Sequence, residues 1–361
     1  MKTISNKKWS IIGLGMMSLS STLLFLSYRI SFFADWYSTH IYPIWVSTLG
    51  RFMGWLPFPV FELLLYLGIM FVLYRIIRSI IRIVRKDQVL RMILHGSIRV
   101  WVFFNMMLLL FIVNCGINYQ RSSFADTYGY GRERYSIQEL KKVAIRLTEE
   151  VNLRADGVSR DHNGIMFFDS KQRVKTVEAI QHLSIVYPSL SGYYPTPKTV
   201  LVPEVLSYQQ VAGVFVPFTI EAYVNGAMVG YTIPFTMVHE LAHVRGYMSE
   251  DEANFIGFLA CTQSGDIELE YSGYLNAWVY VWNELHRYNI EEARAIRDLL
   301  HPSAVLDLQA NREFWARYDG PISELQDRVN DGFLHVQGVE GGILSYNKVV
   351  DLIVSYYDMK K

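Results

Sequence analysis

Long apolar stretches dominate the first third of the chain. The first, residues 9–28, holds twenty residues and no charge, and similar stretches cover about residues 59–74 and 100–120. About 20 apolar residues are enough for a helix to cross a bilayer. A cleaved signal peptide is the alternative for the first stretch, but the stretch is long for one and no clear A-x-A cleavage site follows it. We therefore predict three transmembrane helices at these positions.

The two segments that connect these helices differ in character. Residues 30–58 are rich in aromatic side chains, which favour the membrane–water interface, so we expect this loop along the outer surface. Residues 75–86 carry arginines three and four positions apart, which predicts a basic juxtamembrane helix on an anionic membrane surface. Glu62 is the only charge in the second apolar stretch, and we expect its carboxylate to reach the interface.

Basic residues predict the orientation of the chain in the membrane. Seven Lys or Arg lie in residues 75–99 and three lie before residue 9, whereas the first connection has two, Arg29 and Arg51. Positively charged segments stay in the cytoplasm. The N-terminus is therefore predicted to be cytoplasmic. Residues 1–120 would form a multi-pass anchor in the cell membrane, and residues 121–361 an extracytoplasmic domain.

The pattern in residues 121–361 is that of a folded domain. Ser136 and Glu139 form a capping box at the start of a helix that reaches about Arg154. Residues 184–203 hold four prolines and are expected to be irregular, and residues 211–224 predict one or two strands. Further helices are expected at 236–246, 250–262, 272–289 and 291–300, and near 321–331 and 345–358. The predicted fold class is α+β, mainly helical with a small sheet after the membrane helices.

Composition narrows the partners. The chain is 51% hydrophobic with a formal net charge of zero, which favours a lipid bilayer as partner and argues against nucleic acid, for which a basic patch is expected. Cys115 and Cys261 are far apart in sequence, and Cys115 lies in an apolar stretch, so we expect no disulfide.

The candidate chemistry lies in one short segment. His239, Glu240 and His243 form the pattern H-E-x-x-H. On a helix, residues four apart share a face, so both imidazoles can bind one Zn²⁺ ion while the glutamate acts as general base. Thr236 is a candidate N-cap for this helix, and Gly246 a candidate end.

A second acidic segment follows at Glu250-Asp-Glu-Ala-Asn254. Together the two segments resemble those of the gluzincin metallopeptidases, where a glutamate on a second helix is the third zinc ligand and an Asp four residues later orients a ligating histidine. The resemblance implies a zincin-like domain with His239, His243 and Glu250 as ligands. Asn254 stands where the Asp is usual; its amide oxygen can still accept a ring N–H but carries no charge. The same residues resemble a family of bacterial membrane proteins, domain of unknown function 3810.

Glu252 remains the alternative third ligand. Ala253 and Asn254 lie three and four residues after Glu250, on its own helical face, whereas Glu252 points about 200° away. Only three residues separate Gly246 from Glu250, so Glu250 would lie in the first turn of its helix, capped by Ser249.

The predicted reaction is peptide-bond hydrolysis by a membrane-anchored zinc metallopeptidase at the outer membrane face. Two His and one Glu leave a coordination position open, as in catalytic zinc sites. Glu240 would take the proton of the attacking water and pass it to the leaving amine. A strand within residues 215–225 could pair with a peptide or protein substrate, and Glu221 could approach the zinc. Candidate oxyanion donors are Tyr247, Tyr274, His286, Arg328, His335 and Tyr346.

Two other functions are alternatives for a membrane protein with this pattern. A non-catalytic envelope protein that binds peptide or transmits a signal is favoured only by Asn254, and an intact Glu240 argues against it. Proteolysis within the bilayer is excluded, because Arg245 and three acidic residues at 250–252 crowd the motif. Nothing in the sequence indicates a substrate preference or an oligomeric state.

Overall fold

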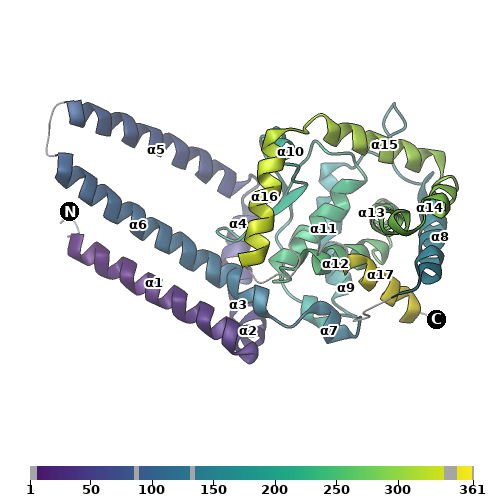
Figure 1. The fold of residues 1–361 in the computed structure, drawn as a ribbon, viewed down its shortest axis with the longest axis horizontal. Coiled ribbons are helices and arrows are strands. Elements are labelled where there is room, and N and C mark those ends of the chain that lie inside the picture. The colour runs from purple at the N-terminus through teal and green to yellow at the C-terminus, as the bar shows by residue number, and fades with distance from the viewer. Residues whose placement is uncertain (1–5, 85–88, 131–134, 337–347, 360–361) are drawn as a thin grey trace.

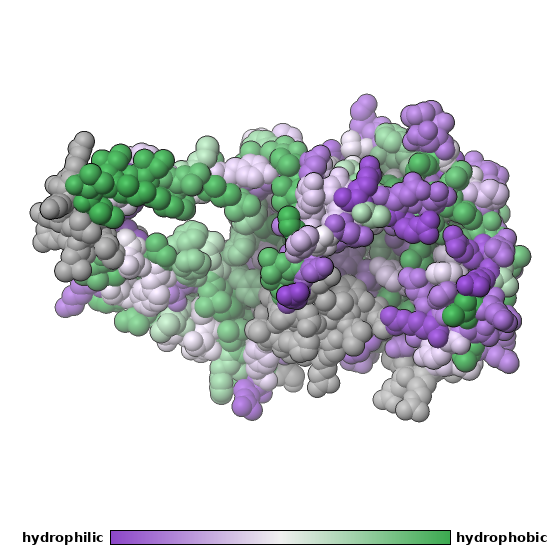
Figure 2. Space-filling model, turned by 45° about the horizontal axis from the view of Figure 1, so that its top comes forward, coloured by the Kyte–Doolittle hydropathy of each residue, from purple (hydrophilic) through white to green (hydrophobic). Residues whose placement is uncertain are grey.

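The computed structural model describes residues 6–84, 89–130, 135–336 and 348–359 (Figure 1). The fold is 74% helical with one three-stranded sheet, as the predicted mixture of many helices and a small sheet requires. Three long helices extend from one side of a rounded body, and the N-terminus lies at their far end (Figure 1). The hydrophobic surface is concentrated on these long helices, whereas the rounded body is largely hydrophilic (Figure 2).

The long helices are apolar enough to cross a membrane, and they coincide with the three apolar stretches of the sequence. They are α1 (Asn6–Arg29), α5 (Val60–Val84) and, in its part Leu94–Asn114, α6 (Val89–Asn114). α1 packs along α6, where the absence of a side chain at Gly13 lets the Trp101 ring approach: a Cβ at Gly13 would lie 2.2 Å from the ring. Only 6% of the apolar window of α5 is buried.

Two boundaries of these helices differ from the prediction. α5 continues without a break through its arginines, so residues 75–84 extend the second apolar helix and do not form a separate basic helix. The reason is local, because no Pro or Gly interrupts that segment. α6 ends at Asn114 instead of residue 120, and the 3₁₀ turn η3 (Gly116–Gln120) follows. Here the Asn114 side chain donates a hydrogen bond to Pro217 O at 2.9 Å, so the chain has entered the rounded body.

The expected loop at residues 30–58 is mostly helical. Its elements are α2 (Ser31–Trp36), η1 (Tyr37–Ile41), α3 (Tyr42–Trp45), η2 (Val46–Gly50) and α4 (Arg51–Trp55). One face is buried, with Tyr42 donating to Val244 O at 3.0 Å. The other face leaves aromatic rings exposed, for example Trp55 at 80%. Because both faces are apolar, the helical period was hidden in the sequence.

The rounded body is built from helices packed around one hydrophobic core. The predicted capping box at Ser136 is present at the start of α8. Four helices, α7, α9, α10 and α15, were not predicted, and α13 starts five residues earlier than expected. The bounds are α7 (Phe124–Tyr128), α8 (Ile137–Arg154), η4 (Ser170–Gln172), α9 (Arg173–Leu183), η5 (Pro188–Leu190), α10 (Pro203–Tyr208), α11 (Thr232–Val244), α12 (Glu250–Thr262), α13 (Ile267–Tyr288), α14 (Ile290–Arg297), α15 (Pro302–Ala316), α16 (Pro321–Val336) and α17 (Lys348–Met359).

The sheet lies against the helix that carries the H-E-x-x-H motif. Its strands are β1 (Lys198–Thr199), β2 (Gly213–Val216) and β3 (Glu221–Val224), in the order β1-β3-β2. β2 pairs antiparallel with β3 and is an edge strand. The prediction of one or two strands in residues 211–224 is therefore confirmed by β2 and β3. Of these two, β2 is the strand at the edge of the sheet.

A buried polar cluster joins the sheet to the start of α5. Lys198 Nζ lies 2.6 Å from Glu221 Oε1 and donates to the carbonyls of Met53 and Phe58. Glu221 also accepts from the N–H groups of Val60 and Phe61 at the N-terminus of α5. The expectation that Glu221 could approach the zinc site is therefore wrong, because the lysine and these amide groups hold its carboxylate.

Glu62, in the first turn of α5, also bonds to the rounded body. Its carboxylate accepts from the N–H groups of Leu201 and Val202, at 2.7 and 3.2 Å, and from the hydroxyl of Tyr66 at 2.6 Å. The only charge of the second apolar stretch thus lies in the first turn of α5, bonded to the rounded body.

Replacing Lys198 with methionine should lower the free energy of unfolding by about 3–5 kcal/mol, because it leaves the buried Glu221 charge without its counter-ion. Denaturant unfolding of the full chain in detergent measures this. The matched control is Lys141→Met, whose ion pair with Glu292 is 42% and 35% exposed and should contribute less than about 1 kcal/mol. Equal losses in the two variants would contradict the expected role of burial.

Candidate metal centre

Helix α11 carries the motif and begins four residues before Thr236. The expectation that Thr236 is the N-cap is therefore wrong. Thr236 is a buried residue within the helix. The reason is tertiary, since Ser272 of α13 accepts a hydrogen bond from Phe235 N at 3.1 Å in place of a local cap. Gly246 ends the helix as predicted, with φ of +90°, a conformation that favours glycine.

Helix α12 brings the acidic segment to α11. Glu250 is its first residue, as predicted, and Ser249 occupies the N-cap position without capping by its side chain. Gly257 lets the two helices approach closely, because a Cβ there would lie 3.3 Å from the Phe235 ring. The short connection after Gly246 therefore does not prevent the first turn of α12 from facing the motif.

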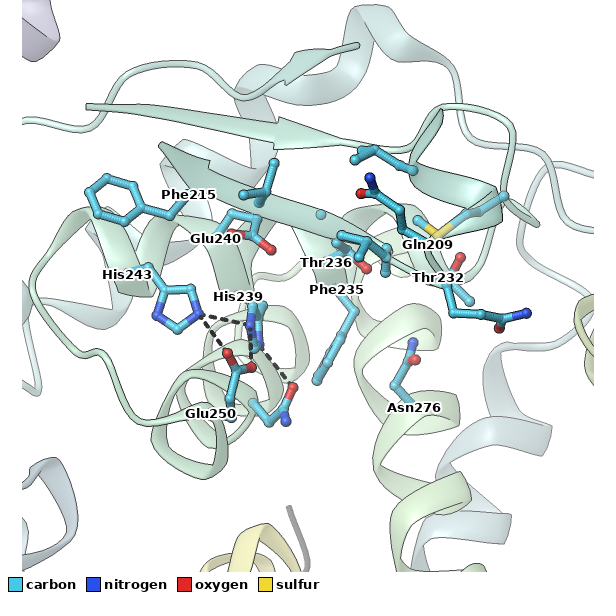
Figure 3. Close-up of a pocket in the computed structure, with 18 of the residues that line it drawn as sticks. Gln209, Phe215, Thr232, Phe235, Thr236, His239, Glu240, His243, Glu250 and Asn276 are labelled. Carbon is cyan, nitrogen blue, oxygen red and sulfur yellow. Dashed lines mark hydrogen bonds and ion pairs between the residues drawn. The ribbon is translucent and has the colours of Figure 1, made fainter. Parts of the chain in front are cut away.

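Three side-chain donor groups converge between these helices (Figure 3). His239 Nε2 lies 3.1 Å from His243 Nε2, and Glu250 oxygens lie 3.2 Å from the first and 3.6 Å from the second. The other nitrogen of each ring faces an acceptor: His239 Nδ1 lies 2.9 Å from Asn254 Oδ1, and His243 Nδ1 lies 2.7 Å from Tyr247 O. With both Nδ1 atoms facing acceptors, both Nε2 atoms are directed into the space that the Glu250 carboxylate also faces.

Nitrogen and oxygen atoms that converge in this way can hold a cation among them. Zinc–ligand bonds of about 2.0–2.1 Å place neighbouring tetrahedral ligands about 3.3–3.4 Å apart. The three separations, 3.1, 3.2 and 3.6 Å, scatter around this value. The donor set therefore fits the spacing of ligands around one metal ion.

Glu240 lies between the sheet and the two imidazoles (Figure 3). Its side chain is buried, and its Oε2 has no hydrogen-bond partner among the described residues. The backbone of Phe215 in β2 hydrogen-bonds to it. The Glu240 carboxylate therefore lies beside the donor set without belonging to it, and one of its oxygens can accept a hydrogen bond or a proton.

The titration of these groups reflects burial and their mutual charges. Burial raises the pKa of Glu240 to about 7, although His239 and His243 oppose the rise. Burial lowers the pKa of His243, but hydrogen bonding to Glu250 and its charge outweigh this and raise it to about 9. For Glu250, burial is outweighed by both histidines, which hold the pKa of its carboxyl well below its usual range. A metal ion must therefore displace a proton from this cluster.

The donor set opens into a cavity of about 820 Å³. Edge strand β2 forms one wall, and helix α13 contributes Asn276 and Tyr280 to another. In β2, Ala212 O bonds to Asn225 N, so by alternation Gly213 and Phe215 direct their backbone groups away from β3. The cavity is thus a cleft beside an edge of β2 that no other described strand covers, where the Phe215 backbone bonds to Glu240.

Glu252, the alternative ligand, is not at the centre. Its Oε1 accepts from Ala125 N at 3.1 Å near the N-terminus of α7, and burial raises its pKa to about 7. None of the expected oxyanion donors whose side chains are described lines the cavity. Tyr247 bonds to Ser189, Tyr274 lies under Arg154, His286 lies against Trp282 and Arg328 faces Glu324, while the side chains of His335 and Tyr346 lie outside the described residues.

The sequence interpretation missed three residues of the cleft. Asn276 and Tyr280 lie four apart on one face of α13, a spacing that the sequence contains, and Tyr280 donates to Asn254 Oδ1 at 3.1 Å. Gly213 is the third. A Cβ there would lie 2.6 Å from Glu240 Oε1 and 2.7 Å from Thr236 Cγ2, so only glycine lets β2 approach this closely.

Gly213→Ala should therefore displace Glu240 while leaving the donor set in place. We expect zinc to stay bound and hydrolysis to fall by about tenfold or more, because a 1 Å misplacement can cost 10²-fold. Metal content and peptide cleavage, measured on the same preparation, check this. Gly320→Ala is the control, since a Cβ at Gly320 meets nothing within 4 Å. Unchanged cleavage in Gly213→Ala would show that the position of Glu240 does not matter.

Comparison with known proteins gives a family. No curated protein matches the chain, and no solved structure does. One family matches residues 37–354, a range that includes α3, α4, the sheet and every residue of the donor set. The chain therefore belongs to the family described as "Protein of unknown function (DUF3810)".

Proposed function

We propose that this protein is a membrane-anchored zinc metallopeptidase of the gluzincin kind. The observation that carries the proposal is the convergence of the His239, His243 and Glu250 donor atoms, whose spacing matches that of ligands around a tetrahedral ion. These three residues would hold the zinc. A bound zinc ion would supply Lewis acidity and an open coordination position.

Glu240 is the proposed general base. Its buried carboxylate has a free oxygen and a pKa of about 7, near the value that suits proton transfer at neutral pH. It accepts the proton of the attacking water and donates it to the leaving amine. Asn276 and Tyr280 also line the cavity, where Asn276 donates to the carbonyls of Tyr231 and Ser272 and Tyr280 donates to Asn254.

Strand β2 is the proposed binding element for the substrate backbone. Gly213 and Phe215 direct peptide groups away from β3, and an extended peptide could pair with them as an additional strand. The cavity at this edge, about 820 Å³, has room for several side chains. The proposed substrate is therefore a peptide or protein segment in extended conformation.

The proposed location of the rounded body is the outer face of the cytoplasmic membrane. The first residues of α1, the last residues of α5 and the first residues of α6 lie at the same end of the long helices (Figure 1). The segments before residue 9 and at residues 75–99 carry the excess of basic residues, which favours a cytoplasmic position for this end of the helices.

A reporter that is active only outside the cytoplasm should work when fused after residue 130 and fail when fused at about residue 90. The two fusions control for each other, because both contain at least one apolar helix. A second reporter, active only in the cytoplasm, should give the opposite pattern. Reversed results would place the donor set in the cytoplasm and contradict the proposed location.

Metal analysis of the purified full-length chain tests the metal, and incubation with a peptide library tests the activity. The full chain is needed because hydrogen bonds that Tyr42 and Val60 donate and Glu62 accepts join the first 120 residues to the rounded body. Less than stoichiometric zinc after dialysis against zinc, or no cleavage of any peptide, would contradict the proposal.

A further inference from the structure

The cleft and the apolar helices share a wall. Phe111 of α6 lines the same cavity as His239 and Glu240, as do Cys115 and Tyr119 just beyond the end of that helix. Cys115 Sγ lies 3.6 Å from the sulfur of Met248, which follows the motif helix. The cavity therefore begins where the third membrane-crossing segment ends.

The turn between β2 and β3 is fixed between two of the apolar helices. On one side the Phe218 ring stacks on Phe61 of α5, with centroids 5.5 Å apart. On the other side Pro217 O accepts from Asn114 of α6. The edge strand thus ends between the outer ends of α5 and α6. Open space separates α5 from the other two long helices (Figure 2).

The rim beside this turn is apolar. Trp55 and Phe52 of α4 are 80% and 58% exposed, and Leu201, Val205 and Tyr208 around α10 are about half exposed. Glu62 and Lys198 bond this rim to the N-terminus of α5 and to α4. Exposed aromatic and aliphatic side chains at the end of a membrane helix are typical of the membrane–water interface. The mouth of the cleft therefore lies at the bilayer surface.

We infer that the substrate is a polypeptide anchored in the same bilayer, cut in the segment that leaves the membrane. The inference rests on the proposed peptidase function. β2 has four residues and extends about 13 Å at 3.3 Å per residue, so a chain emerging beside α5 and α6 reaches the donor set within about ten residues. An anchor in the same membrane also raises the effective concentration of that segment at the cleft.

The test uses the full-length protein in lipid vesicles and one mixture of twelve-residue peptides with random sequence. The mixture is presented in three forms: free, attached to an apolar 20-residue helix through a flexible spacer of six residues, and attached through a spacer of 30 residues. We expect cleavage of the short-spacer form to be about tenfold faster than that of the long-spacer form, as the −3/2 power of spacer length gives, and the free form to be slowest.

The two proposals fail in different ways. If the free or long-spacer peptides are cut as fast as the short-spacer form, the inferred substrate class is wrong and the peptidase function stands. If no form is cut, or if Glu240→Gln cuts them equally well, both the function and the inferred substrate are wrong.

Discussion

Glu240→Gln should retain zinc and lose hydrolysis. Glutamine has the same shape as glutamate but cannot accept the proton of the attacking water, so the rate should fall by about 10²–10⁴-fold. Zinc should stay, because the three converging donor atoms belong to other residues. The measurement is the cleavage rate of a peptide mixture together with the zinc content of the same sample.

A matched control comes from Glu268. It is also a buried glutamate with one oxygen that lacks a partner among the described residues, but it bonds to Ser159 and does not line the cavity. Glu268→Gln should therefore leave the cleavage rate within about twofold, as expected of a change away from the reacting atoms. Equal rates in Glu240→Gln and the unaltered chain would make the peptidase proposal wrong.

The local patterns of the sequence were sufficient to indicate which side chains converge at the centre of the site. H-E-x-x-H places two imidazoles on one face of α11, and the spacing of Glu250, Ala253 and Asn254 indicated which face of α12 is turned toward them. These are relations within single helices, which periodicity reveals. The convergence of the three donor atoms depends in addition on the packing of α12 against α11, which the close approach at Gly257 permits.

What the sequence did not reveal depends on contacts between distant residues. The carboxylate of Glu221 could have faced the metal, and only the fold brings Lys198 to it. Gly213 is one glycine among 24, and its role comes from the position of Glu240 in another element. Helix α15 was missed because a charged residue, Asp307, lies on its buried face. There it accepts from Arg160, Tyr271 and Met166 N, which obscures the apolar period.

Glu250→Gln and Glu252→Gln should separate metal binding from folding. Loss of a residue that merely orients a ligand costs about 10–100-fold in metal affinity, so loss of a direct ligand should cost at least 100-fold. Glu250→Gln is therefore expected to weaken zinc binding by about 100-fold or more. His243→Ala should lose most of the metal for the same reason.

Glu252→Gln is the matched variant, two residues away in the same first turn of α12. Its carboxylate accepts from Ala125 N at 3.1 Å, and a glutamine oxygen can accept the same bond, so the fold should survive. Because burial raises the pKa of Glu252 to about 7, the neutral side chain also suits this position. Zinc affinity should change by less than about threefold, since no ligand is removed. Tight binding retained in Glu250→Gln but lost in Glu252→Gln would reverse the assignment, and it would require the first turn of α12 to rotate by about 200° from its position against α11.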